Sequence, residues 1–177
     1  SVGGTGVVLV DGENVKIIDG SRGLINPFIN TIVEDNSGNI WLTTNGNGLV
    51  KYGDNKFLSL SFVNDIGGNI VRAIFQDSKK NYWFSIAGKG VVQFRKNHKK
   101  TFTPQDNPGL LNIRDFHELP NGKLLMAGFN GIFEFNGSSF KEVSERYGLP
   151  IGTGVIDILS VDDELWLTTQ GMGVIHI

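Results

Sequence analysis

Residues 28–52 of the chain read FINTIVEDNSGNIWLTTNGNGLVKY. Three short apolar runs stand in this stretch, around Ile32, Trp41 and Leu49, and polar or glycine-rich segments separate them. Apolar runs of this length between turn residues are typical of β-strands, and they are too short for buried helices. Residues 28–52 therefore predict three consecutive strands joined by tight turns.

The same pattern recurs along the whole chain. The apolar residue of the first strand recurs every 42 residues, and the tryptophan of the second strand at intervals of 42, 42 and 41. The glycine before the third strand recurs at 42, 42, 41 and 42. The three columns are Ile32, Ile74, Phe116, Ile158; Trp41, Trp83, Leu125, Trp166; and Gly6, Gly48, Gly90, Gly131, Gly173. We predict that the first two columns form the structural core.

Each unit also contains a fourth strand, for example at residues 57–60 and 140–143. Four strands in a period of about 42 residues are typical of a β-propeller blade. The sequence thus predicts an all-β fold, a β-propeller or propeller arc of about four blades with four-stranded antiparallel sheets. Helix is expected for one turn at most, at residues 142–146.

The repeat also predicts how the chain is divided. We expect a single propeller segment over residues 1–177, with a partial blade at 1–22 and repeats at 23–64, 65–106, 107–146 and 147–177, the last of them incomplete. The chain begins with the third and fourth strands of one repeat and ends after the third strand of another. This arrangement favours an excised part of a longer propeller. The alternative is a four-bladed ring that residues 15–18 close by strand exchange. An open arc would pack against neighbouring blades or a second copy.

Composition excludes several classes of function. The 177 residues carry a formal net charge of −2, with 40% hydrophobic and 19% charged residues. This balance does not fit a general binder of nucleic-acid backbones or a disordered chain. Apolar runs of about five residues are too short to span a membrane. Because the chain has no cysteine, it has no thiolate metal site and no cysteine nucleophile.

The sequence contains no convincing motif for catalysis or metal binding. His98, His117 and His176 do not have the spacing of metal ligands. The oxygen-rich stretch 35–39 lacks the glutamate of a calcium loop, because position 46 is glycine. We therefore predict no enzyme activity, no metal and no cofactor. An enzyme on this fold, such as a lyase or glycosidase, would have to use Asp115 and His117.

One group of residues is a candidate ligand site. The first strand of each propeller blade lines the central channel, and Asn30, Arg72 and Arg114 occupy matching positions there, beside Asp115. Two cations and an amide at a channel mouth could bind a carboxylate or sugar hydroxyls. The alternative is that they bind loop carbonyls or pair with Asp115 and Asp157.

The repeat resembles a known family. Residues 28–44, with Gly48-Leu49 and Lys51-Tyr52, resemble the two-component regulator propeller repeat, and Gly148-Leu149-Pro150 resembles the segment that leads into it. The second repeat departs from the pattern at Lys80, and the third has lost its tryptophan. The resemblance implies the periplasmic sensor region of a hybrid histidine kinase, a non-catalytic module for which oligosaccharides are candidate ligands. A scaffold that binds proteins is the alternative.

Overall fold

The computed structural model describes residues 6–20, 24, 28–53, 56–60, 70–96, 98–162 and 164–177. These residues form antiparallel β-sheets with two short 3₁₀ helices, so the predicted all-β fold class is confirmed. The chain forms two compact units, residues 1–72 and 73–177, with the boundary inside a strand. No helix in the described part of the chain is both long and apolar enough to cross a bilayer.

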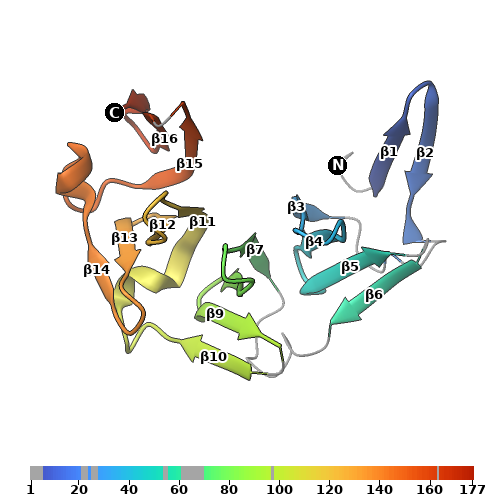
Figure 1. The fold of residues 1–177 in the computed structure, drawn as a ribbon, viewed down its shortest axis with the longest axis horizontal. Helices are drawn as coiled ribbons and strands as arrows, with labels where there is room; N and C mark the ends of the chain where they lie inside the picture. Colours follow the sequence, from blue (N-terminus) through green and yellow to red (C-terminus); the bar gives the residue numbers. More distant parts are fainter. Residues whose placement is uncertain are drawn as a thin grey trace. The chain divides into compact units, whose positions relative to one another are not determined.

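The first unit contains a hairpin and a four-stranded sheet (Figure 1). The hairpin consists of β1 (Val7–Asp11) and β2 (Asn14–Ile18). The sheet has the order β3-β4-β5-β6, with β3 (Ile29–Glu34), β4 (Ile40–Thr44), β5 (Leu49–Gly53) and β6 (Lys56–Leu60). Neighbours in the sheet are neighbours in the sequence, as in a propeller blade.

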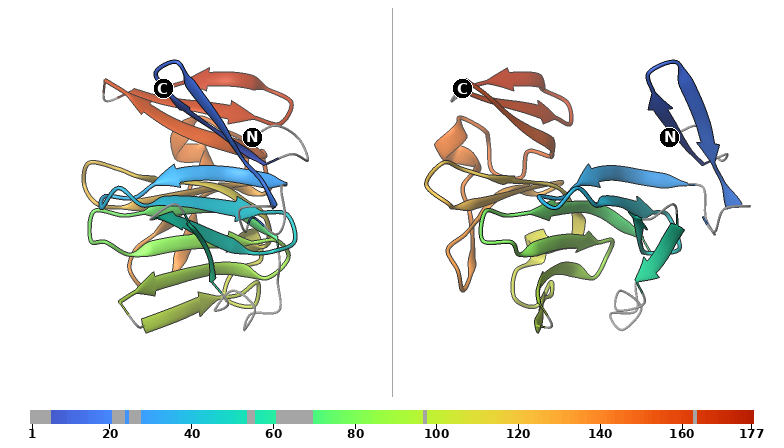
Figure 2. Two further views of the ribbon diagram at one scale, coloured as in Figure 1. Left: turned by 90° about the vertical axis from the view of Figure 1, so that its right-hand side faces the viewer. Right: turned by 45° about the vertical axis from the view of Figure 1, so that its right-hand side comes forward.

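Two more sheets of this kind and a three-stranded sheet follow (Figures 1 and 2). The first comprises β7 (Val71–Gln76), β8 (Tyr82–Ile86), β9 (Gly90–Arg95) and β10 (His98–Phe102). The second comprises β11 (Ile113–Glu118), β12 (Leu124–Gly128), β13 (Gly131–Phe135) and β14 (Phe140–Glu142). The third comprises β15 (Val155–Val161), β16 (Glu164–Thr169) and β17 (Gly173–His176).

The glycine column has a backbone reason. Gly90 and Gly131 have φ of 113° and 125°, a region that L-residues with a side chain rarely adopt. A Cβ on Gly90 would also lie 2.1 Å from the carbonyl oxygen of Phe102, on the fourth strand. Glycine at this position therefore lets the third strand pass close to the fourth.

In the second unit, the sheets are held together by two apolar clusters. One buries Trp83, Phe102 and Phe116 between β7–β10 and β11–β14. The other buries Leu125 and Ile158 between β11–β14 and β15–β17. Consecutive sheets of this unit thus pack face to face.

Most of the predicted core residues are buried, namely Trp41, Trp83, Leu125, Ile74, Phe116 and Ile158. Two differ from that expectation, since Trp166 is 38% exposed and Ile32 is 45% exposed. Trp166 lines a hollow together with Leu159 and Val174, whereas its neighbour Leu167 packs in the cluster with β11–β14. Ile32 is not part of the buried cluster of its unit, which consists of Leu24, Leu42 and Val50.

Two local expectations can be compared with the structure. The turn expected at 142–146 is the 3₁₀ helix η4 (Ser144–Tyr147). A second 3₁₀ helix, η3 (Pro108–Asn112), was not expected; Asn107 caps it by accepting a hydrogen bond from the Gly109 N–H. The predicted repeat boundaries after residues 22 and 64 lie outside the described residues, and the division into repeats stays a prediction.

Candidate functional site

The candidate column coincides with a β-bulge in the first strand. In β3 the pairing passes from Ile29 with Thr44 to Thr31 with Thr43, so Asn30 has no partner in the ladder. The same shift places Arg114 in a bulge of β11 and Ile156 in a bulge of β15. A bulge re-aims the side chain of the extra residue. The repeated position found in the sequence is therefore a repeated structural feature.

In the first unit the predicted residues link two strands. The side-chain amide of Asn30 donates a hydrogen bond to the Val71 carbonyl at 2.8 Å, and the Thr31 hydroxyl donates to the Arg72 carbonyl at 2.9 Å. The Arg72 Nε atom is buried and has no hydrogen-bond partner among the described residues. Asn30 thus binds a main-chain carbonyl, which was the alternative considered for it.

In the second unit Asp115 links two sheets. Its Oδ2 atom accepts a hydrogen bond from the backbone N–H of Ile158 at 2.9 Å, across the interface between β11 and β15. Burial, with a smaller contribution from the nearby Asp157, raises the pKa of the Asp115 carboxyl to about 7, although the backbone hydrogen bonds from Ile158 and Phe116 act to lower it. Asp115, with Asp157 nearby, therefore binds a proton more readily than an ordinary aspartate does.

The cation of this site is Arg114. Its guanidinium carbon lies 4.3 Å from the centre of the Phe129 ring, a cation–π geometry. Phe129 belongs to the turn after β12, and its N–H donates to the Asn112 carbonyl at 3.4 Å. An arginine stacked on an aromatic ring is held in orientation and can still donate in its own plane to a carboxylate or a hydroxyl.

His117 lies two residues beyond Asp115 on β11. Its side chain is half-buried, and burial lowers its pKa below the usual value, although Glu118 acts in the opposite sense. The imidazole is therefore neutral at pH 7. A neutral imidazole can accept or donate a hydrogen bond, so His117 is the described group nearest to Asp115 in sequence that could exchange a proton.

The four predicted ligand residues are divided between the two units. Asn30 and Arg72 belong to residues 1–72, and Arg114 and Asp115 belong to residues 73–177. The structure brings Arg114 and Asp115 together on β11, with Asp157 on the neighbouring β15. Their use as ligand contacts stays a prediction.

The structure contains a buried group of three hydrogen-bonded side chains, an aspartate, an asparagine and a tryptophan, that was not predicted from the sequence. Asp77 accepts hydrogen bonds from the Asn81 amide at 2.7 Å and from the Trp83 indole at 2.9 Å. Asp35 does the same for Asn39 and Trp41, both at 2.8 Å. The oxygen-rich stretch 35–39 is thus a turn that satisfies a buried indole. The signal was Asp-x3-Asn-x-Trp, which recurs after 42 residues.

The other two repeats lack the trio. In the third repeat, Leu119, Lys123 and Leu125 occupy its three positions. In the fourth repeat, Trp166 remains without the aspartate and stacks on His176, with ring centres 4.3 Å apart. His176 in turn lies 2.7 Å from Glu164. The loss of the carboxylate acceptor accompanies the exposure of Trp166.

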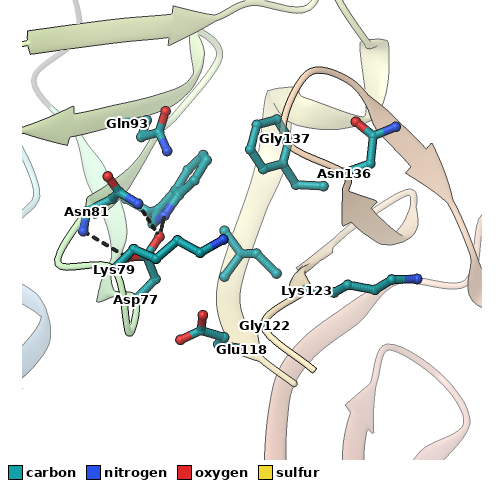
Figure 3. Close-up of a pocket in the computed structure, with 12 residues that line it drawn as sticks. Asp77, Lys79, Asn81, Gln93, Glu118, Gly122, Lys123, Asn136 and Gly137 are labelled. Carbon is teal, nitrogen blue, oxygen red and sulfur yellow. Dashed lines mark hydrogen bonds between the residues drawn. The ribbon is translucent and has the colours of Figure 1, made fainter. Parts of the chain in front are cut away.

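A separate pocket of about 300 Å³ opens between β7–β10 and β11–β14 (Figure 3). Its apolar floor includes Trp83 and Phe135, and Lys79 extends across it. Most polar groups around it are already bound within the protein. Glu118, for example, accepts hydrogen bonds from the N–H and the hydroxyl of Ser78 at 2.6 and 2.8 Å.

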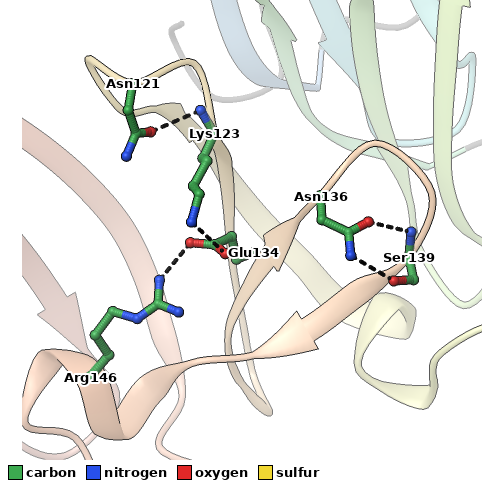
Figure 4. A network of polar contacts seen from close by, with 6 residues as sticks. All are labelled: Asn121, Lys123, Glu134, Asn136, Ser139 and Arg146. Atoms are coloured by element: carbon green, nitrogen blue, oxygen red, sulfur yellow. Dashed lines mark hydrogen bonds and ion pairs between the residues drawn. The ribbon is translucent and has the colours of Figure 1, made fainter.

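Near this pocket, Glu134 is held by two cations (Figure 4). Lys123 lies 3.2 Å from one carboxylate oxygen and Arg146 binds the other. Burial alone would raise the pKa of Glu134, but the hydrogen bonds from Arg146 and Lys123 outweigh it and lower the pKa. The ammonium of Lys123 accordingly points away from the pocket (Figure 3). The network joins η4 to β13 and to the turn that precedes β12.

Comparisons with known proteins support the resemblance found in the sequence. Residues 23–46 match the sequence model of the family described as two component regulator propeller. This confirms the resemblance over one repeat. A search of curated proteins finds no match to the sequence.

Three solved structures share the fold. The extracellular domain of a putative hybrid two component system from B. thetaiotaomicron is 21% identical over 97% of this chain, with a TM-score of 0.78. A second such domain from that organism is 16% identical over 86%, with a TM-score of 0.63. Virginiamycin B lyase from Staphylococcus aureus is 18% identical over 84%, with a TM-score of 0.61. The chain spans 25%, 24% and 55% of these structures.

Proposed function

We propose that the chain is a non-catalytic ligand-recognition segment in the periplasmic sensor of a two-component regulator. The observation that carries this proposal is the likeness over 97% of the chain to the extracellular domain of a putative hybrid two component system. The two component regulator propeller match at residues 23–46 supports it independently of the fold. The description of these neighbours as extracellular domains supports the proposed periplasmic location.

The candidate binding groups are Arg114 and Asp115. The stacked guanidinium of Arg114 offers in-plane donors, and the Asp115–Asp157 pair offers a donor or an acceptor according to its protonation. Oligosaccharides fit such a set, because their hydroxyl groups both donate and accept, and uronic acids add a carboxylate for the arginine. Binding would act on signalling only if it favours one arrangement of the protein over another.

The test is a glycan-array screen of the protein, followed by calorimetric titration of any sugar that binds. The proposal predicts saturable binding that Arg114→Ala weakens at least about tenfold, which corresponds to about 1.4 kcal/mol. Arg95→Ala is the matched control, because Arg95 is an exposed arginine at the end of β9. Binding that is unchanged in Arg114→Ala would exclude this site. Absence of binding to a broad glycan set, with protein partners retained by an Arg72→Ala/Arg114→Ala variant, would favour the scaffold alternative.

A second candidate is a lyase-type enzyme. Two observations favour it: the likeness to virginiamycin B lyase and the neutral His117 beside Asp115 on β11. A neutral imidazole and a carboxyl group are the kinds of group that general acid–base catalysis uses. Turnover of a glycan or of virginiamycin B that His117→Ala abolishes, in a variant that still folds, would establish this function instead.

A further inference from the structure

The second repeat concentrates positive charge. Residues 78–105 contain seven of the 16 lysines and arginines of the chain and none of its 18 aspartates and glutamates. This segment comprises β8, β9 and β10 with the turns around them. Because the chain as a whole has a net charge of −2, the segment is opposite in sign to the rest of the protein. A basic region of this kind attracts an anionic partner.

Protection of a sheet edge does not account for this charge. Lysine on an edge strand keeps other strands from pairing with it, and β10 is an outer strand of its sheet. Lys79, however, lies in the turn between β7 and β8, on the other side of the sheet. The outer strand β14 of the next sheet carries only Lys141, beside Glu142. The charge of the second repeat therefore indicates a role other than edge protection.

Two of these lysines lie at the pocket between β7–β10 and β11–β14. The side chain of Lys79 extends across the pocket (Figure 3). Lys100 is the cross-strand partner of Gln93, which lines the pocket, and its ammonium lies 4.7 Å from the centre of the Phe102 ring. Gln93 in turn pairs with Trp83, so Lys100, Gln93 and Trp83 project from the same face of the sheet. The pocket and both lysines belong to one compact unit, residues 73–177.

The pocket offers donors rather than acceptors. In the part of the chain that the structure describes, neither ammonium group forms a salt bridge or a hydrogen bond. The two carboxylates at the pocket are already engaged. Both oxygens of Asp77 accept hydrogen bonds, one of them from the Trp83 indole, and both oxygens of Glu118 accept from Ser78. Anionic groups therefore fit this pocket better than hydroxyl groups, which also need acceptors.

The floor of the pocket selects the kind of partner. Trp83 and Phe135 form part of it, and the volume of about 300 Å³ is large enough for one apolar side chain. A polysaccharide supplies hydroxyl groups and no such side chain. An acidic protein segment with one aromatic or aliphatic residue matches both the free ammonium groups and the apolar floor, because an apolar anchor in a pocket with charged groups around it is typical of protein interfaces.

We propose that the basic face of β8–β10 and the adjoining pocket bind an acidic segment of a protein partner, with its carboxylates at Lys79 and Lys100 and one apolar side chain on the pocket floor. This surface is separate from the bulge of β11. Arg114 stands near the start of that strand, whereas Glu118, which lines the pocket, stands at its end. The inference goes beyond the proposed function, because it holds whether or not a sugar binds at Arg114.

The probe is a fluorescein-labelled acidic peptide, a run of glutamates with one phenylalanine at its centre, titrated with the full chain by fluorescence anisotropy. Two further peptides separate the parts of the site, one with alanine in place of the phenylalanine and one with glutamine in place of every glutamate. Lys79→Gln and Lys100→Gln each remove one ammonium group. Lys89→Gln is the matched control, because Lys89 is also exposed but lies in the turn between β8 and β9, at the other end of the sheet.

The proposal predicts saturable binding that Lys79→Gln and Lys100→Gln each weaken at least about threefold and their combination at least about tenfold, whereas Lys89→Gln leaves it unchanged. The alanine peptide should bind at least about threefold more weakly, and the glutamine peptide should not bind. In NMR spectra, the signal of the Trp83 indole N–H should shift on binding of the phenylalanine peptide. Thermal unfolding of each variant checks that it still folds.

Three results would overturn the proposal. The first is no binding of the phenylalanine peptide, or binding that the combined variant leaves unchanged. The second is equal affinity for the phenylalanine and alanine peptides, because the pocket would then hold no anchor. The third is tighter binding of polygalacturonate than of the peptide at the same lysines, since this surface would then bind an anionic polysaccharide instead.

Discussion

The indole N–H of Trp83 donates a hydrogen bond to the Asp77 carboxylate at 2.9 Å, and both side chains are buried. The same carboxylate accepts from the Asn81 N–H at 2.8 Å and from the Asn81 side chain. One aspartate thus closes the turn between β7 and β8 and satisfies the only polar atom of the indole. Stability should depend on it more than on any exposed carboxylate.

Asp77→Ala should destabilise the protein by about 1–3 kcal/mol, because it leaves buried donors without an acceptor. The measurement is the free energy of unfolding from urea denaturation. Glu145→Ala, at an exposed position, should change it by less than about 0.5 kcal/mol. Equal effects of the two substitutions would show that the Asp77 hydrogen bonds contribute nothing net.

The tryptophans of the repeat should differ in how much each contributes to the free energy of unfolding. Trp83 is 1% exposed, whereas Trp166 is 38% exposed. Trp83→Ala should cost about 3–5 kcal/mol, as for other buried aromatic side chains, and Trp166→Ala less than about 1.5 kcal/mol. Thermal or urea unfolding of the two variants measures the difference. A larger loss for Trp166→Ala would mean that its face is covered in solution.

Two glycines with positive φ provide a matched pair. Gly90 and Gly88 have φ of 113° and 69°, but only at Gly90 would a Cβ meet the main chain, 2.1 Å from the Phe102 carbonyl oxygen. Gly90→Ala should therefore destabilise by about 1–3 kcal/mol more than Gly88→Ala. Urea denaturation of both variants gives the comparison. Equal losses would indicate that φ alone requires glycine in this column.

Stability should fall as pH rises because of Asp115. Its pKa of about 7 lies above the ordinary value of 3.8, so the folded chain binds more protons than the unfolded chain between about pH 4 and pH 7. The stabilisation is complete below about pH 4 and is lost as pH rises through 7. Asp115→Asn keeps an oxygen that can accept from Ile158 and removes the charge. It should abolish this loss, on the order of 2 kcal/mol.

The measurement is the unfolding free energy of both proteins at pH 4.5, 6 and 8. The lowered pKa of His117 acts in the opposite sense below about pH 6.5, but it is common to both proteins and cancels in their difference. Parallel pH profiles for wild type and Asp115→Asn would contradict the assignment.

The fold could be predicted because its determinants are local and repeated. The second strand expected around Trp41 is β4 at Ile40–Thr44, and the first strand expected around Phe116 is β11 at Ile113–Glu118. Apolar periodicity and turn residues specify such strands directly. The exposure of Trp166 could not be predicted, because a column of equivalent residues does not tell which of them another sheet covers.

For the candidate site, the sequence predicts which positions of the repeat are involved but not the contacts that their side chains make. The sequence repeat places Asn30 and Arg114 at the same position of the first strand, and in the structure this position is a β-bulge. The contacts were not visible, because the bond from Asn30 to the Val71 carbonyl depends on how neighbouring strands align. The trio around Asp77 could have been found, since its spacing recurs at Asp35.

Amide hydrogen exchange at Ile158 tests most directly whether consecutive repeats stack with a first-strand carboxylate on the backbone of the next sheet. The Ile158 N–H should exchange slowly in the wild type, and at least about tenfold faster in Asp115→Ala, while amides between β12 and β13 keep their protection. An Ile158 amide that exchanges as fast in the wild type as that of Gly152, in an exposed turn, would contradict this stacking.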